Sequence, residues 1–497
     1  MTRGTTSNAT AARISLVALV ALAALAALPL RLPFALRPVS ADEGGFLMVG
    51  AQWHPGPSLY GAYWVDRPPL LIAVFGIVAH LPDPVLALRL VGVAAVVVAA
   101  LLAGRVARLL VPDAAWAPVA AAGLVVVLTS TPAFGALAEG DGELLALPLV
   151  LAAIALAAHG LLEGSAPGWW LAAGAAAMAA ALVKQSMLDG GLAVLVLALG
   201  AVPSGAPGRR RRVAAAGLGA VGLLAVVLAV SAWRGTSPTG LWDAVVTFRM
   251  EAGRVIAAGA PSSNTDRAHA LLRSVVLSGA VALALLPLLP GGRRPASGVR
   301  LRLLAGVVLA WEAVGVVGGG SYWLHYLIGL VPGLVLALLT AVGRRRALPL
   351  VGAWIAIAAT LAWVGFWRSA PGDADELRMR RELAAVSTPG QTGLVAFGDP
   401  ALLWEARLPC PYPLLWSLPV RVRDPRLTAL DRLLASPRRP TWVVVSGEGL
   451  GTWGVDAVRA QATFDRHYRE VERFGELGLY RAARSGSGQV RRPTLGS

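Results

Sequence analysis

The sequence predicts an α-helical polytopic membrane protein of about eleven transmembrane helices, followed by a small C-terminal α/β domain. Composition is the first indication: 56% of the 497 residues are hydrophobic and 14% are charged, whereas soluble domains are about 45 to 50% apolar and about 25% charged. Mean hydropathy is +0.65. Several apolar runs also exceed the roughly 18 residues that mark a membrane span: 14–36, 85–110, 213–233 and 322–342.

The apolar runs place the individual spans. We expect them near residues 12–34, 84–110, 114–131, 143–160, 168–184, 186–203, 213–233, 270–290, 301–320, 322–342 and 347–367. The first run is longer than the apolar core of a signal peptide, which predicts an uncleaved anchor. Segment 68–81 is apolar but short and is bounded by prolines, so we expect an interfacial helix there.

Arginines indicate the orientation, because their short clusters all fall on one side of the predicted bundle. They are Arg105 with Arg108, Arg209–Arg212, Arg293 and Arg294 with Arg300 and Arg302, and Arg344–Arg346. The positive-inside rule makes that side cytoplasmic. Three segments are then extracytoplasmic: segment 35–83, loop 234–269 and the tail beyond 368. Loop 234–269 is long enough to act as a lid. The net charge of +16 therefore predicts orientation and the lipid bilayer as a partner, and no nucleic acid.

The chain is expected to hold a transmembrane catalytic domain over 1–370, an extracytoplasmic α/β domain over 371–484 and a disordered tail over 485–497. In the α/β part, segments 394–397, 442–445 and 477–480 are predicted strands. Asp424 and Pro425 suit the start of a helix that carries leucines at helical spacing through Leu434. Cys410 is the only cysteine, so an intrachain disulfide is excluded.

Two acidic clusters lie at the predicted outer ends of spans. Asp42 and Glu43 follow the first span, where a carboxylate could act as general base on an acceptor hydroxyl. A solvated acidic pair is the alternative. Glu139, Asp141 and Glu143 precede the fourth span, where they could enter a site or simply favour the helix macrodipole.

Residues 41–46 (ADEGGF) and 60–70 (YGAYWVDRPPL) resemble the first outer loop of the GT-C membrane glycosyltransferases. The similarity is to the protein O-mannosyltransferase and aminoarabinose transferase group, glycosyltransferase families 39 and 83, in which an Asp-Glu pair ends the first span. It extends over residues 10–370, with an unusual insert at 53–57. The resemblance implies catalytic roles for Asp42, Glu43 and one acid of the second cluster, of which Asp141 is the favoured match and Glu139 and Glu143 stay open.

The resemblance also implies a set of substrate-binding residues at the outer face. They are Arg67, Lys184, Gln185, His325, Tyr326, Glu139 and Glu143. Lys184, the only lysine, could hold a lipid phosphate, although snorkelling is the alternative. His325 could contact donor phosphate or sugar, or could be a packed interior histidine. Further candidate phosphate partners are Arg249, Arg254, Arg267 and Arg273.

The resemblance implies transfer of a sugar from a polyprenyl-phosphate donor to a hydroxyl of a protein, lipid or polysaccharide acceptor in the cell envelope. Asp42 would be the base, with inversion at the anomeric carbon. A divalent cation is the one candidate cofactor, although neither zinc-type His/Cys spacing nor a nucleotide-binding loop is present. The alternatives are a transporter or lipid flippase, or a non-catalytic scaffold. Acids gathered at one face, away from the midplane, favour the enzyme.

Overall fold

The computed structural model describes residues 17–35, 37–134, 140–164, 166–200, 208–259, 261–290, 295–343, 347–368 and 374–483. The chain divides into two compact units, Met1–Ala370 and Pro371–Ser497. The expected disordered tail, 485–497, lies outside the described residues.

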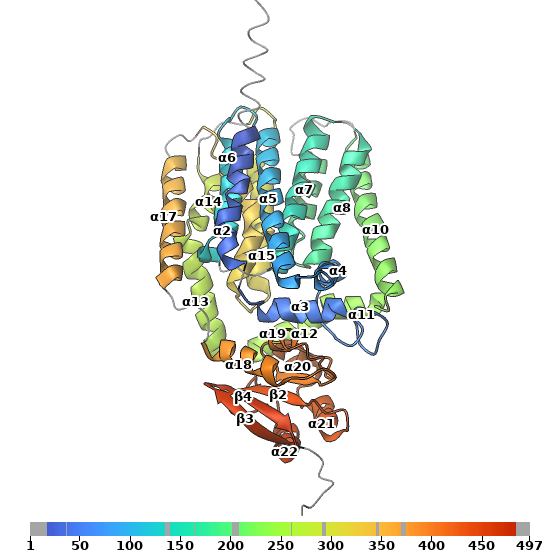
Figure 1. Ribbon diagram of the computed structural model, residues 1–497. Coiled ribbons are helices and arrows are strands. Elements are labelled where there is room, and N and C mark those ends of the chain that lie inside the picture. The colour runs from blue at the N-terminus through green and yellow to red at the C-terminus, as the bar shows by residue number, and fades with distance from the viewer. Residues whose placement is uncertain are drawn as a thin grey trace, which may run out of the picture. The chain divides into compact units, whose positions relative to one another are not determined.

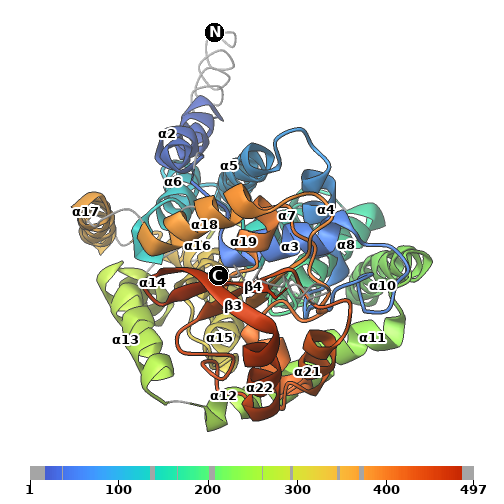
Figure 2. The same cartoon turned by 60° about the horizontal axis from the view of Figure 1, so that its bottom comes forward.

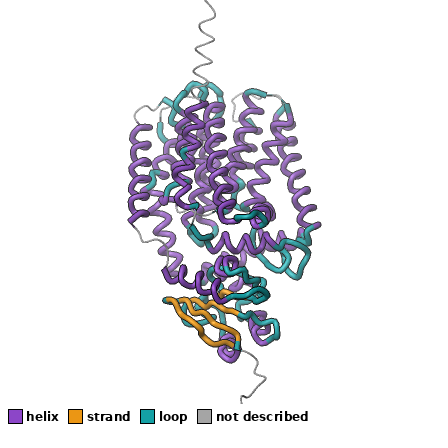
Figure 3. Tube along the Cα trace, viewed as in Figure 1, coloured by secondary structure: helices purple, strands orange, loops and turns teal. Residues whose placement is uncertain are grey.

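The first unit is helical throughout its described elements (Figures 1 and 3). These are α2 Ala27–Arg31, η1 Leu32–Phe34, α3 Ala41–Ala51, α4 Pro69–Ala79, α5 Pro84–Leu110, α6 Ala117–Thr129, η2 Pro132–Phe134, α7 Gly142–Leu162, α8 Pro167–Val183, α9 Asp189–Ala198, α10 Arg209–Trp233, α11 Pro238–Trp242, η3 Asp243–Thr247, α12 Phe248–Ala258, α13 Pro261–Leu277, α14 Ala280–Leu285, η4 Leu286–Leu288, α15 Leu301–Gly318, η5 Leu324–Leu330, α16 Val331–Leu339 and α17 Ala347–Arg368.

Five of these helices are long and apolar enough to cross a membrane: α5, α7, α10, α15 and α17, the last from Leu348. A sixth span results if the bent pair 264–277 and 280–288 is counted as one. The chain is therefore a multi-pass membrane protein by length and composition. The total of eleven spans stays a prediction.

Several predicted spans are short or broken among the described residues, and three of them illustrate how. Helix α9 has 10 residues, about 15 Å at 1.5 Å per residue, half of what a bilayer core requires. The expected helix 270–290 bends by 65° at Gly279, whose φ of +81° ends the first segment. Span 322–342 divides into the 3-10 helix η5 and the α-helix α16. The prediction of a loop over 234–269 is also wrong, because this segment forms the helices α11, η3 and α12 and the start of α13.

Side-chain contacts show that α5 and α7 run in the same direction. Arg105 near the end of α5 pairs with Glu163 just after α7. At the opposite end, Arg89 of α5 binds Glu43, which also accepts a hydrogen bond from Gly140 before α7. The cluster at Arg105 and the acidic cluster therefore lie at opposite ends of these two helices.

Helices α3 and α4 build the end that carries the acids, where α3 runs across the upright helices (Figures 1 and 2). They cross at Gly50 and Gly76, where a Cβ atom on Gly50 would clash with the Gly76 backbone. Phe46 and Phe75 pack edge to face at 5.2 Å. The helix expected over 68–81 is confirmed as α4; its interfacial position stays a prediction.

The second unit is a small α/β domain whose strands appear in orange in Figure 3. Its elements are α18 Ala374–Val386, β1 Gly393–Ala396, α19 Ala401–Glu405, α20 Ser417–Arg423, α21 Thr428–Ala435, β2 Trp442–Ser446, α22 Val458–His467, β3 Tyr468–Phe474 and β4 Leu477–Ala482. The sheet order is β1-β2-β4-β3. β1 and β2 are parallel, while β4 is antiparallel to both β2 and β3.

The expected strands 394–397, 442–445 and 477–480 correspond to β1, β2 and β4. Strand β3 was missed because Arg469 to Glu472 are all exposed, which leaves no apolar alternation to read. The helix expected from Asp424 begins later, at Thr428. Asp424 still caps it, because its carboxylate accepts hydrogen bonds from the amides of Ala429 and Leu430 at 3.1 and 3.2 Å.

Candidate active site

The first acidic pair opens helix α3, and its two carboxylates have different surroundings. Ser40 caps the helix by accepting a hydrogen bond from the Glu43 amide, while Glu43 accepts one from the Ser40 amide at 2.9 Å. This capping box fixes the start of the helix. Asp42 is half-buried and interacts electrostatically with Arg67 and His325. Of the pair, Asp42 is the carboxylate that faces the other predicted site residues.

Glu43 is instead enclosed by donors. It is 2% exposed and forms a bidentate ion pair with Arg89, whose Nη2 lies 3.0 Å from Oε2. The Gly140 amide donates to Oε1 at 2.7 Å. With both oxygens occupied, Glu43 holds α3 to α5 and to the residue before Asp141.

Asp66 ties two arginines to the same place. It is 5% exposed and accepts from Arg67 at 2.7 Å and from Arg249 at 2.8 Å. Burial alone would raise the pKa of Asp66, but the two guanidinium groups hold this pKa below its ordinary value. The carbonyl of Asp66 accepts a hydrogen bond from Gln185 at 3.2 Å. Asp66 thus joins the first outer segment to α12 and to the end of α8.

Lys184, directly after α8, points back toward the start of α7. Its Nζ lies 2.9 Å from Glu143 Oε1, with the side chains 12% and 4% exposed. The same ammonium is 5.2 Å from the ring centre of Tyr326. Lys184 therefore has a carboxylate and an aromatic face around it, and is placed by protein contacts, so simple snorkelling does not describe its position.

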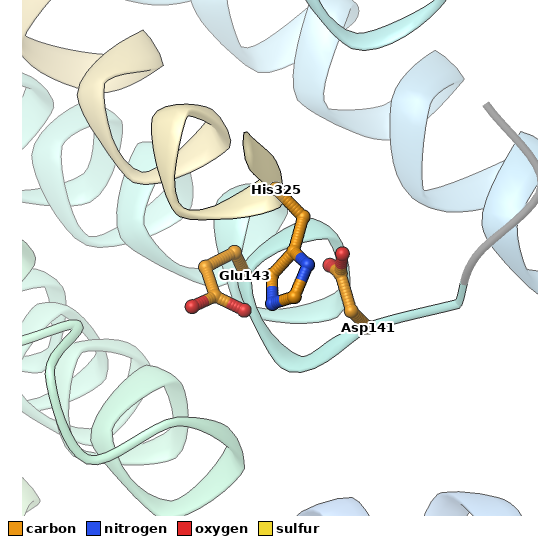
Figure 4. Close-up of side chains that lie close together, drawn as sticks. All are labelled: Asp141, Glu143 and His325. Atoms are coloured by element: carbon orange, nitrogen blue, oxygen red, sulfur yellow. The ribbon is translucent and has the colours of Figure 1, made fainter. Parts of the chain in front are cut away.

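Asp141, Glu143 and His325 form a cluster of potential metal ligands. One ligand atom from each lies within 4.8 Å of the others, and Figure 4 shows the imidazole between the two carboxylates. Asp141 caps α7 by accepting from the Leu144 amide at 3.0 Å. The buried Oε2 of Glu143 lacks a hydrogen-bond partner among the described residues. Two carboxylates and one imidazole are a donor set that suits a divalent transition metal.

A cavity of about 240 Å³ lies beside this cluster. Arg67, Lys184 and Arg249 give its wall three positive charges, with Glu143, Gln185 and Tyr326 among the polar lining. Its apolar lining comes mainly from α12 and α15 and comprises Ala252, Ile256 and Val314, with Val245 of η3. A cationic wall beside an apolar one suits a phosphate attached to a hydrocarbon chain.

The structure thus brings together most of the predicted site residues. The contacts described above join seven of them: Arg67, Asp141, Glu143, Lys184, Gln185, His325 and Tyr326. Asp42 interacts with Arg67 and His325 electrostatically. Glu139 lies outside the described residues. Arg249 lines the cavity, whereas Arg254, Arg267 and Arg273 do not.

Sequence reasoning missed four buried charged residues. Asp66 stood inside the quoted motif without a role, and Arg89 was read only as part of an apolar run. Asp189 and Glu312, 1% and 4% exposed, were passed over because each is a single acid in apolar sequence. The sequence did contain a signal for them, because an ionisable residue within an apolar membrane segment is rare and usually has a function.

No protein-family model and no curated protein sequence matches the chain. Solved structures do. The Archaeoglobus fulgidus oligosaccharyltransferase in complex with Zn and sulfate is similar over 93% of this chain and 73% of its own, at 13% identity and a TM-score of 0.58. The oligosaccharyltransferase AglB from Archaeoglobus fulgidus, in complex with an inhibitory peptide and a dolichol-phosphate, is similar over 95% of this chain and 74% of its own, at 12% identity and a TM-score of 0.51.

ArnT from Cupriavidus metallidurans is similar in two structures, each at a TM-score of 0.46. The structure bound to undecaprenyl phosphate covers 96% of this chain and 99% of its own at 16% identity, and the apo structure covers 95% and 98% at 17% identity. At these identities the similarity to the oligosaccharyltransferase establishes the fold. The chain has the fold of these oligosaccharyltransferase structures, in agreement with the membrane-glycosyltransferase fold that the resemblance implies.

Proposed function

We propose that this protein transfers a sugar from a polyprenyl-phosphate donor to a hydroxyl acceptor at the extracytoplasmic face of the membrane. The observation that carries the proposal is the cavity in which Arg67, Lys184 and Arg249 adjoin an apolar wall. The dolichol-phosphate and undecaprenyl phosphate in the similar structures support this choice of ligand. The clustered arginines at the other end of the bundle support the assignment of sides.

Binding of the donor follows from this charge arrangement. The lipid chain stays among apolar side chains, and only its phosphate and sugar enter the cavity. Phosphate is already a good leaving group, so the site requires no general acid. Positive charge beside the departing oxygen stabilises the charge that develops there. Arg67, Lys184 and Arg249 supply this charge.

Asp42 is the proposed general base. It is the half-buried carboxylate at the edge of the site, whereas Glu43 is occupied by Arg89. Asp42 removes the proton of the acceptor hydroxyl while the acceptor oxygen attacks the anomeric carbon and the sugar–phosphate bond breaks. A single displacement inverts that carbon. The proton ends on Asp42 and the electron pair of the broken bond on the phosphate. Glu43 serves as a positioning residue that orients α3, and with it Asp42.

Asp141, Glu143 and His325 would hold a divalent cation. Their geometry fits it, and Glu143 Oε2, beside the other two ligands, meets no hydrogen-bond partner in the part of the chain that the structure describes. The Zn in the similar oligosaccharyltransferase structure supports this assignment. Such a cation would supply further positive charge next to the donor phosphate. Lys184, 2.9 Å from Glu143, keeps this carboxylate ionised and oriented.

The C-terminal domain is proposed to bind part of the acceptor. A cavity of about 460 Å³ lies among its own residues, with Trp453 and Phe474 and the acids Glu376 and Asp399 in the lining. Trp453 is fixed by a hydrogen bond from its Nε1 to the Ala396 carbonyl at 3.0 Å. Aromatic faces with carboxylates around them suit a ligand rich in hydroxyl groups.

The decisive experiment separates binding from transfer. Purified protein is given a radiolabelled polyprenyl-phosphate hexose, and donor binding and release of polyprenyl phosphate are measured. Asp42→Asn should retain donor binding and lose about 10² to 10⁴ in turnover. Asp113→Asn, an exposed acid in the loop after α5, is the matched control. Near-normal turnover of Asp42→Asn would remove Asp42 from the role of base. Absence of binding in the unaltered protein, tested with hexose and pentose donors, would contradict the proposed donor class.

A further inference from the structure

A second, smaller cavity lies behind the donor pocket. It has a volume of about 10 Å³ and is lined by Asp189, Glu312, Glu143, Tyr326 and five small or apolar residues. A volume of about 10 to 15 Å³ holds one water-sized particle. Glu143 and Tyr326 also line the donor pocket, so the two cavities share a wall.

Two of the carboxylates that line this small space are those of Asp189 and Glu312. Asp189 begins α9 and Glu312 lies in α15. Both oxygens of Asp189 and Oε2 of Glu312 lack a hydrogen-bond partner among the described residues. The two groups are close enough for a direct hydrogen bond if one of them carries a proton. None of the lining residues is basic, and Lys184 is already paired with Glu143.

The local backbone fixes the position of the Glu312 carboxylate next to Asp189. The Gly333 amide donates to Glu312 Oε1 at 2.8 Å, and a Cβ atom at Gly333 would clash with Glu312 Oε2. Gly315 and Gly329 bring main chain to the cavity wall. Two buried carboxylates in contact cannot both stay ionised without positive charge between them. Either a proton or a metal cation must supply it.

We propose that Asp189 and Glu312 bind a hard divalent cation of the Ca²⁺ or Mg²⁺ class in this cavity. A single divalent ion neutralises both carboxylates. The charged donors in the lining are the carboxylate oxygens of acidic side chains, which hard cations prefer. This set differs from Asp141, Glu143 and His325, whose imidazole favours transition metals. The bound ion joins α9 and α15 and stiffens the wall behind Glu143 and Tyr326. The proposal is independent of sugar transfer.

The test measures cation binding, not activity. Full-length protein in detergent is stripped of metal and unfolded by heat over a range of CaCl₂ concentrations, with NaCl at equal ionic strength as reference. Calcium should raise the melting temperature of the unaltered protein. Glu312→Gln and Asp189→Asn should each weaken the apparent calcium affinity by at least about 100-fold. His325→Asn, which removes the nitrogen ligand of the other cluster, and the exposed-site control Asp113→Asn should titrate like the unaltered protein.

Two results would overturn the proposal. One is a calcium titration that Glu312→Gln and Asp189→Asn leave unchanged. The other is an unaltered protein that responds equally to CaCl₂ and NaCl, which would mean that the pair shares a proton. If neither variant folds, metal analysis of His325→Asn protein dialysed against excess CaCl₂ decides, because this variant lacks a ligand of the other cluster. It should retain one calcium per chain, and retention of no calcium would refute the site.

Discussion

Asp66 allows a direct test of the proposed phosphate pocket, because it is the counter-ion of Arg67 and Arg249, two of the three cations that line this cavity. Asp66→Asn keeps the shape of the side chain and removes its charge. Loss of one partner from a buried ion pair costs about 3 to 5 kcal/mol. The Arg67 and Arg249 side chains are 18% and 29% exposed, so solvent screens part of this loss and we expect about 2 kcal/mol.

A lipid phosphate in the pocket would replace the missing carboxylate as the counter-ion of both arginines. Undecaprenyl phosphate should therefore stabilise Asp66→Asn more than the unaltered protein, with a coupling free energy of about 1 kcal/mol or more. Thermal unfolding in detergent, with and without the lipid, is measured for the unaltered protein and for Asp66→Asn, and these four measurements give the coupling free energy.

Undecaprenol, which has the same chain without phosphate, is the ligand control, and Asp113→Asn is the protein control. Both should show no coupling. Equal stabilisation of Asp66→Asn and the unaltered protein by undecaprenyl phosphate would refute the reasoning, because the phosphate would then not contact Arg67 or Arg249.

Three further predictions concern other parts of the chain. Glu43→Gln leaves Arg89 buried without its counter-ion and should lower the free energy of unfolding by about 3 kcal/mol. Thermal unfolding measures this loss, and the double variant Glu43→Gln/Arg89→Met, which removes the unpaired charge, should recover much of it. Burial raises the pKa of Asp399 to about 6, above about 3.9 for the unfolded chain, so the C-terminal domain should lose stability as pH rises from about 4 to about 6. Asp399→Asn should flatten this slope in hydrogen exchange of the β1 amides, measured on the full chain. Trp453→Ala should raise the acceptor KM about fivefold with little change in kcat, because it removes an aromatic stacking interaction with the acceptor that contributes about 1 kcal/mol. A fall in kcat in place of the rise in KM, measured by steady-state kinetics, would contradict this.

Hydropathy predicted the long helices well because their signal is local. Helix α5 begins at Pro84 and ends at Leu110, as the apolar run does. Where the structure departs from the expected spans, the cause is tertiary. The bend at Gly279 requires a left-handed backbone that many glycines in this chain could adopt, and the 3-10 turn η5 carries His325 to the site without any mark in hydropathy.

The candidate site residues were predicted where a short motif or an isolated charge marked them. Lys184 stood out as the only lysine, and Asp42 by its place after the first span. Their partners could not be found this way. Asp66 pairs with Arg249, 183 positions away in the sequence, and Glu43 pairs with Arg89, 46 positions away. Sequence periodicity does not predict contacts over such separations. Asp42 and Glu43 are adjacent in sequence, yet only the packing of α5 shows that Glu43 is occupied.

The paired charges of the site also bear on the proposed reaction. Arg67, Lys184 and Arg249 face Asp66 and Glu143, so the pocket itself carries about one net positive charge. A polyprenyl-phosphate sugar is a phosphodiester with one negative charge, which this pocket would neutralise. When the sugar leaves, the phosphate gains a second negative charge, and Asp42 loses its own as it takes the acceptor proton. The charge within the site is therefore conserved through the step, and negative charge moves from Asp42 toward the three cations. An environment fixed in advance by ion pairs such as Asp66 with Arg249 favours that movement without reorganisation.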